Sequence, residues 1–94
     1  MEFGNPQTLN AKIKFSSLSV EGNDLVLQLG FEVSGGKTVI SDKKHATDNL
    51  ISTILTTLEV RSWEELSRKF ARIRVSGDKV ISVGNLIDNK WVEL

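Results

Sequence analysis

Residues 11–33, AKIKFSSLSVEGNDLVLQLGFEV, hold two runs of alternating apolar and polar residues on either side of a turn. In the first run the apolar residues occupy alternate positions from Ala11 to Phe15, which is typical of a strand with one buried face. The apolar positions change parity from Leu18 onward, and this change predicts a β-bulge near residues 16–17.

The second run continues the same pattern after Glu-Gly-Asn-Asp at residues 21–24, a cluster that favours a tight turn. Its apolar residues share one face of a strand: Leu25, Leu27, Leu29, Phe31 and Val33. Two alternating runs joined by such a turn predict a β-hairpin.

Residues 38–41 predict a short third strand, after which the apolar period changes to that of a helix. The helical stripe contains Leu50, Ile51, Ile54, Leu55 and Leu58. Thr47 or Asp48 is the predicted N-cap of this helix. Residues 62–65, Ser-Trp-Glu-Glu, have the pattern of a capping box and predict a second, short helical turn.

A second strand pair follows at residues 71–75 and 81–83, with a turn at 76–79 and a last short strand around Trp91. The order β-β-β-α-β-β predicts an α+β fold, with one main helix packed on one face of a small antiparallel sheet. We expect residues 1–10 to be a flexible arm and residues 11–94 to form a single domain.

The composition sets limits on the class of protein. The 94 residues include no cysteine, and 12 basic residues balance 12 acidic ones. Small secreted domains usually depend on disulfides, so we expect a cytoplasmic location. No apolar run approaches the length of a membrane-spanning helix, so we expect no contact with a membrane.

The residues of catalytic chemistry are sparse, since the chain has no Cys or Tyr and a single histidine, His45. Asp42, His45 and Asp48 are spaced by three, but zinc sites are usually built on several His or Cys ligands. Gly-Gly-Lys-Thr at residues 35–38 lacks the first glycine of a phosphate-binding loop and precedes a strand, not a helix. We therefore expect no enzyme, no metal and no cofactor.

Three surfaces are candidates for binding. The first is a basic cluster on the polar faces of two strands and the residues before one of them, which is suited to phosphates or an acidic protein surface. It comprises Lys12, Lys14, Arg68, Lys69, Arg72 and Arg74. The parities of Phe15, Phe31 and Phe70 suit the core, so we expect few aromatic rings on this surface.

The second surface is the outward face of the helix, where small hydroxyl side chains replace the usual charged residues and suit a second copy of the chain or another partner. Its residues are Ser52, Thr53, Thr56 and Thr57. The third precedes the helix and is a candidate anion site: Gly35, Gly36, Lys37, Lys43, Lys44 and His45.

The C-terminal half resembles short uncharacterised proteins encoded by bacteriophages and prophages. The resemblance covers residues 58–92 and lies in VRSWEEL at 60–66, FARIRV at 70–75, GDKV at 77–80 and SVGNLIDNKW at 82–91. The relatives often have Pro-Gly where this chain has Ser67-Arg68. The shared pattern implies that Trp63 and Trp91 anchor the core.

The resemblance implies a phage setting, in which small proteins without catalytic groups inhibit bacterial defence systems. We therefore expect an inhibitor, similar to anti-CRISPR proteins, that binds a bacterial defence protein in the host cytoplasm and forms a homodimer. Two alternatives stay open. One is an oligomeric sponge for a small signalling nucleotide, and the other is a nucleic-acid-binding accessory protein.

Overall fold

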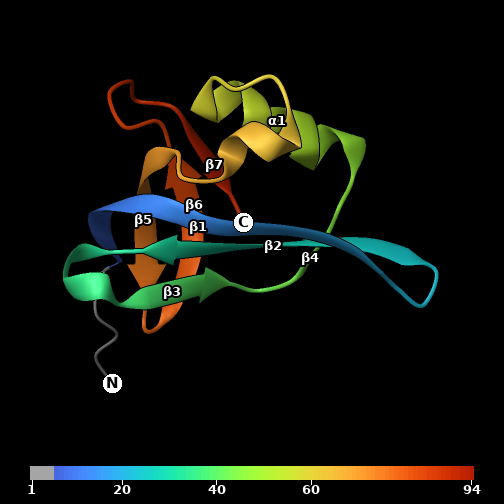
Figure 1. Ribbon diagram of the computed structural model, residues 1–94, viewed down its shortest axis with the longest axis horizontal. Helices are drawn as coiled ribbons and strands as arrows, with labels where there is room; N and C mark the ends of the chain where they lie inside the picture. Colours follow the sequence, from blue (N-terminus) through green and yellow to red (C-terminus); the bar gives the residue numbers. More distant parts are fainter. Residues whose placement is uncertain (1–5) are drawn as a thin grey trace.

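The computed structural model describes residues 6–94 of the chain (Figure 1). It confirms the predicted α+β class, because one mixed sheet and one main helix account for most of the described residues. The strands are β1 (Gln7–Glu21), β2 (Asp24–Glu32), β3 (Thr38–Ser41), β4 (Lys44–His45), β5 (Phe70–Ser76), β6 (Lys79–Gly84) and β7 (Trp91–Glu93). The helices are α1 (Asp48–Leu58) and the short 3₁₀ turns η1 (Ser34–Gly36) and η2 (Trp63–Leu66).

The predicted hairpin is present as β1 and β2, which pair from Lys12↔Glu32 to Glu21↔Asp24. Gly22 takes a φ of 63° at the first central position of the turn. Only glycine adopts this conformation without strain, and it gives the two-residue turn that suits the twist of a hairpin. The turn therefore fixes which residues of β1 and β2 lie opposite each other.

The sheet closes into a barrel. β1 pairs with β2 and with β5, and the remaining neighbours are β5–β6, β6–β3 and β3–β2. Most pairs are antiparallel, but β3 and β6 run parallel through Ile40↔Lys79 and Ser41↔Val80. The predicted sheet was antiparallel throughout. The parallel pair arises because α1 and β5 lie between the two strands in the chain, and a long crossover returns β6 in the direction of β3.

The closed circuit contains five strands, β1, β2, β3, β5 and β6, whereas β4 and β7 lie outside it. The helix α1 lies in the chain between β3 and β5, the third and fourth strands of this circuit, and this connectivity corresponds to that of the OB-fold. A shared connectivity describes the scaffold and assigns no activity, since unrelated functions occur on one fold.

The core fills the inside of the barrel, and α1 covers the end at which β5 begins and β6 ends (Figure 1). The residues at alternate strand positions face inward, and the helix adds Ile54 and Leu58. The buried apolar residues of β1, β2, β3, β5 and β6 are Ala11, Ile13, Leu27, Leu29, Phe31, Val39, Ala71, Ile73, Val75, Val80 and Val83. Full burial of one such large side chain contributes about 1.5–3 kcal/mol.

The expectation of a flexible arm is wrong for residues 7–10. They form the first part of β1 and pair with β5 from Gln7↔Val75 to Asn10↔Arg72. Their sequence shows no clear alternation, and the pairing comes from the open edge that β5 presents to them. Residues 1–5, which were also part of the expected arm, lie outside the described residues.

The helix begins as predicted, with Thr47 as its N-cap. Its side-chain oxygen accepts a hydrogen bond from the Leu50 amide at 3.1 Å. The predicted capping box at η2 is also present, since Glu65 Oε1 accepts from the amides of Arg61 and Ser62 at 2.7 and 3.3 Å.

The bulge lies at Lys14, not at residues 16–17, because the register shifts between Ile13 and Phe15. The shift turns Phe15 to the outer face, where its ring covers Gly30 directly opposite on β2. Phe15 is therefore 37% exposed and does not belong to the core, contrary to the expectation from its parity.

The Phe15–Gly30 contact gives a first prediction. A Cβ at residue 30 would lie 2.1 Å from the Phe15 ring, so Gly30→Ala must displace the ring. We expect a loss of about 1–2 kcal/mol in the free energy of unfolding, measured by urea denaturation. In the Phe15→Ala background the same change has no ring to displace and is neutral or slightly stabilising. An equal loss in both backgrounds would contradict the contact.

Candidate functional site

The outer face of β5 carries Phe70, Arg72 and Arg74, which alternate with the buried residues of the same strand. Phe70 stands at the start of the strand and is 59% exposed, contrary to its predicted place in the core. Its parity is that of the two arginines, so a strand whose other face is apolar directs all three side chains outward.

Lys12 of β1 lies opposite Phe70 in the β1–β5 register. Its Nζ is 6.0 Å from the centre of the Phe70 ring, within the range of a cation–π contact. The pairing of β1 with β5 therefore brings Lys12 next to the arginines, as the sequence led us to expect if these strands were neighbours.

Trp91 of β7 completes this surface. It lies opposite Gly84, whose missing side chain lets the indole rest flat on the outside of the sheet. The guanidinium groups of Arg74 and Arg72 lie 4.0 and 5.0 Å from the ring centre. Trp91 is thus a half-buried outer residue that supports the arginines, and the expectation that it anchors the core is wrong. Trp63 is half-buried and packs against the core.

We call this surface the basic–aromatic face and define it as Lys12, Phe70, Arg72, Arg74 and Trp91. Within residues 6–94, its three cations make no salt bridge, whereas Lys43, Lys79 and Lys90 each pair with a carboxylate. No paired carboxylate therefore neutralises these cations, and charged donors of this kind form the stronger hydrogen bonds to a bound anion.

The two arginines differ in their other contacts. Arg72 donates from Nε to the Asn85 carbonyl at 2.8 Å and from Nη2 to the Asp88 carbonyl at 2.9 Å. It therefore holds the loop between β6 and β7. Arg74 makes no hydrogen bond to the described residues and lies on Trp91 with its donors available. Arg72 thus supports the structure, and Arg74 is better placed to bind a ligand.

The side chain of Asn85 makes three hydrogen bonds that hold the loop between β6 and β7 in place. Its side-chain amide donates to the Thr57 carbonyl at 3.0 Å, and its side-chain oxygen accepts from the amides of Ile87 and Asp88 at 2.9 Å each. Asn85 is buried, so these bonds satisfy its polar atoms. They fasten the loop to the end of α1.

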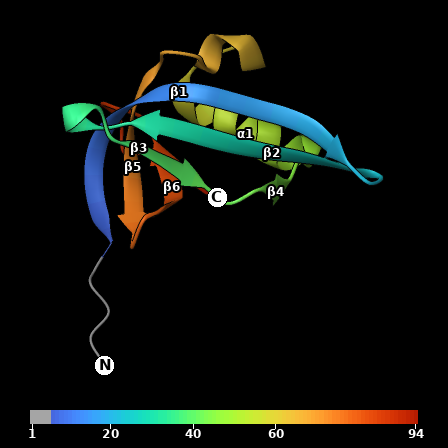
Figure 2. The ribbon, with the colours of Figure 1, turned by 60° about the horizontal axis from the view of Figure 1, so that its bottom comes forward.

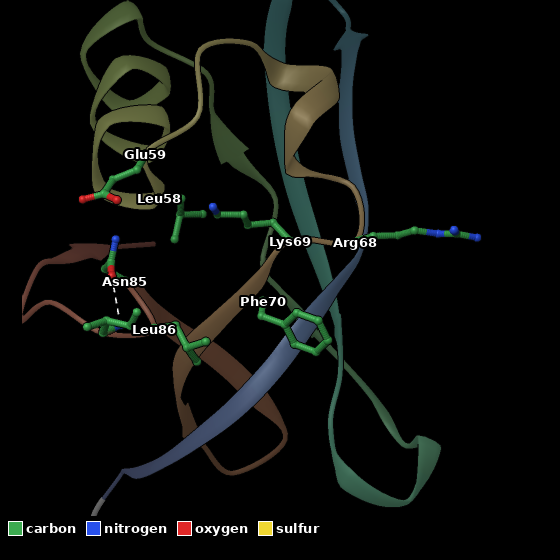
Figure 3. A pocket seen from close by; sticks show the side chains of 8 residues that line it. Leu58, Glu59, Arg68, Lys69, Phe70, Asn85 and Leu86 are labelled. Atoms are coloured by element: carbon green, nitrogen blue, oxygen red, sulfur yellow. Dashed lines mark hydrogen bonds between the residues drawn. The ribbon is translucent and has the colours of Figure 1, made fainter.

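Two hollows lie on either side of Phe70. One, of about 310 Å³, lies between the end of α1 and the β6–β7 loop, and its walls include Leu58, Lys69 and Leu86 (Figure 3). The other, of about 290 Å³, is lined by Asn10, Ala11, Lys12, Glu32, Val33, Ser34 and Phe70. The second hollow combines an aromatic wall with amide, hydroxyl and carboxylate groups, the groups that recognise a planar polar ring.

Three other predicted cations are not part of the basic–aromatic face, although Arg68 and Lys69 line the hollow beside Phe70. Lys14 lies at the bulge and donates to Thr38 Oγ1 at 3.1 Å on β3. Arg68 and Lys69 diverge, with Lys69 directed toward Leu58 and Arg68 away from the hollow (Figure 3). The structure therefore gathers Lys12, Arg72 and Arg74, and separates the rest of the predicted basic cluster.

Two exposed ion pairs, Lys90–Glu59 and Lys79–Asp42, lie outside the basic–aromatic face. A hydrogen bond from Lys90 at 2.9 Å lowers the pKa of Glu59 and raises that of Lys90. A similar bond at 2.8 Å from Lys79 lowers the pKa of Asp42 and raises that of Lys79. These groups are exposed, so the pairs add little stability.

The predicted anion site is not gathered in one place. Gly35 and Gly36 lie at the β2–β3 turn, whereas Lys43, Lys44 and His45 follow the far end of β3. Lys43 also pairs with Glu21 at 2.6 Å. Lys37 lies beside the glycines, so the extended strand β3 separates it from the other cations of this set.

The predicted hydroxyl face of α1 is only partly exposed. Ser52 and Thr56 are exposed, Thr53 is half-buried, and Thr57 is buried with Ile54 and Leu58. Thr57 was expected outside, but it follows Ile54 by three positions and so lies on the same side of the helix. Thr53 and Ser52 donate to the Asn49 carbonyl at 2.7 and 3.3 Å.

Within residues 6–94, no group of three or more His, Cys, Asp or Glu side chains is arranged to hold a metal ion. In the same range, no helix has both the length and the apolar character required to cross a bilayer. No protein-family model, no curated protein and no solved structure matches the chain. The resemblance to phage proteins therefore stays a prediction.

The different contacts of Arg72 and Arg74 give a second prediction. Arg72→Ala removes two hydrogen bonds from a half-buried charged group, and we expect a loss of about 2 kcal/mol in unfolding free energy. Arg72→Lys keeps the charge but not the forked donors, so it should recover only part of this loss. Arg74→Ala removes one cation–π contact with Trp91 and no hydrogen bond, so it should cost only about 1 kcal/mol. Equal losses in chemical denaturation for both alanine variants would contradict the assigned roles.

Proposed function

We propose that this domain binds single-stranded nucleic acid through the basic–aromatic face. The observation that carries the proposal is Phe70, an aromatic ring 59% exposed on a strand whose same face carries Arg72 and Arg74. An aromatic ring exposed among cations is the kind of platform on which unpaired bases stack.

The chemistry of the face favours a single strand over a duplex. A base can stack on Phe70 only when it is unpaired and turned outward. The hollow beside Phe70 offers the side chains of Asn10, Glu32 and Ser34 to the edge of such a base. Lys12 and Arg74 then neutralise the phosphates on either side.

The barrel supplies a second argument of lesser weight. Barrels with this connectivity commonly bind single strands on an outer face that combines cations and aromatic rings. The face described here lies on β1, β5 and β7, whereas the usual binding face of such barrels is centred on their second and third strands. The proposal therefore rests on the residues and not on the scaffold.

The third prediction concerns affinity and its dependence on salt. We expect a labelled oligonucleotide of about ten nucleotides to bind in fluorescence anisotropy. Each phosphate contact contributes a slope of about −0.7 to log Kobs against log salt concentration. Lys12→Ala and Arg74→Ala should each weaken binding and make the slope less negative by about 0.7. Phe70→Ala should weaken binding by about 1–3 kcal/mol and leave the slope unchanged.

Lys43→Ala is the matched control, because it removes one positive charge at the hairpin end, away from the basic–aromatic face. It should leave affinity and slope near those of the parent chain. Absence of binding at low salt would refute the proposal. Equal binding to duplex and single strand, with no effect of Phe70→Ala, would show a general attraction of cations for phosphate and would also refute it.

The sequence also predicts a phage protein that inhibits a bacterial defence protein in the host cytoplasm. These three points stay predictions that rest on the resemblance in the sequence. An inhibitor of this kind would present the same cations to an acidic protein surface. The absence of enzymatic activity also stays a prediction. The nucleotide sponge stays a prediction too, and its predicted anion site would have to form between chains.

A further inference from the structure

The end of the β1–β2 hairpin projects beyond the barrel (Figure 2). One edge of this projection is covered, because β4 pairs with β2 at Val26↔His45 and Leu27↔Lys44. The other edge belongs to β1. Here β5 pairs only with residues 7–12, and within residues 6–94 no strand adjoins residues 17–21 on that side.

The direction of the main-chain groups on this edge follows from the hairpin register. In an antiparallel pair, residues alternate between bonding across the pair and pointing away from it. The main-chain amide and carbonyl of Leu25 on β2 point away from β1, as shown by the carbonyl, which accepts a hydrogen bond from the Ala46 amide at 2.8 Å. Val20 lies opposite Leu25, so its main-chain amide and carbonyl point away from β2, toward the open edge.

The same alternation holds along β1. The Ser16 carbonyl points to the edge, where it accepts from Trp63 Nε1 at 3.3 Å. Leu18 lies midway between Ser16 and Val20, so its main-chain amide and carbonyl point to the same edge. The amides and carbonyls of Leu18 and Val20 thus face outward, and Ser17 and Ser19 bond to β2.

The side chains on this edge are apolar and exposed. Leu18 is 41% exposed, Val20 70% and Leu25 38%, and all three lie on one face of the hairpin. Residues 16–20, Ser-Ser-Leu-Ser-Val, contain no charge and no proline. Natural sheets usually protect an open edge with lysine, proline or a bulge, so an edge without these devices favours pairing with another strand.

We propose that this edge pairs with the same edge of a second copy of the chain, antiparallel about a two-fold axis at Ser19. In this register Leu18 of one copy exchanges main-chain hydrogen bonds with Val20 of the other, and the reverse. Ser19 faces Ser19 across the axis. The apolar side chains of both hairpins then form one continuous strip.

The sequence of the edge favours a second copy as the occupant. The pairing satisfies the outward groups of both Leu18 and Val20, and it places no like charges opposite each other. A register centred on Leu18 would instead require the Ser16 carbonyl, which Trp63 already occupies. A two-fold contact of this type closes on itself and gives a dimer. It uses none of the residues of the basic–aromatic face, so it is independent of the proposed function.

The fourth prediction uses the absence of cysteine from the chain. Across the axis, Ser19 forms a non-hydrogen-bonded pair with a Cα separation of about 4.5 Å, which suits a disulfide. Ser19→Cys should therefore become a covalent dimer under mild oxidation, as seen on a non-reducing gel. Ser17→Cys is the control, because Ser17 faces Glu21 of the other copy and should cross-link far more slowly.

Sedimentation equilibrium of the parent chain supplies the second readout, with a monomer–dimer equilibrium expected. Val20→Lys should raise the dissociation constant of the dimer by at least about tenfold, since a charge would enter the apolar strip. Ile40→Lys, which changes an exposed apolar residue of β3, should leave it unchanged. Equal cross-linking of both cysteine variants, or a monomer at every concentration, would overturn the proposal. A monomer whose edge captures a strand of another protein would overturn it as well.

Discussion

The pairing of β1 with two strands is the constraint on which the rest of this structure depends. Its first half pairs with β5 and its second half with β2, and the bulge at Lys14 lies where one partner gives way to the other. Without the β1–β5 pair the sheet would stay open, and the apolar faces of β2 and β5 would not meet in one core.

The closure also positions both surfaces on which the proposals rest. Residues 7–12 bring Lys12 beside Phe70 and the arginines of β5, so Lys12 joins the basic–aromatic face only in the closed barrel. Beyond the bulge β1 leaves β5, and its residues 17–21 extend past the barrel with one open edge. One strand thus provides part of a polar binding surface and, farther along, an apolar edge.

Glycine opposite an aromatic ring recurs on the outside of this barrel. Phe15 covers Gly30 and Trp91 covers Gly84, each directly across a strand pair. The rings shield main chain that would otherwise meet water, and the glycines give them the space to lie flat. At Trp91 the arrangement has a further consequence, because the indole supports the guanidinium groups of Arg72 and Arg74.

The sequence by itself determined the local elements: the hairpin and its turn, the helix with its Thr47 cap, the capping box at η2, and the strands at 38–41 and after residue 70. Each depends on contacts between near neighbours, so periodicity and turn residues predict it. The equal parity of Phe70, Arg72 and Arg74 was also present in the sequence and was a sufficient sign that Phe70 faces outward with them.

Only the tertiary structure decided the closure through residues 7–10, the parallel β3–β6 pair, the bulge at Lys14 and the outer position of Trp91. Alternation divides a strand into two faces but does not say which strand becomes its neighbour, or in which register. An aromatic ring resting on a glycine outside the barrel therefore has the same period-two pattern as a core residue. Pairing between residues distant in the chain is what distinguishes the two.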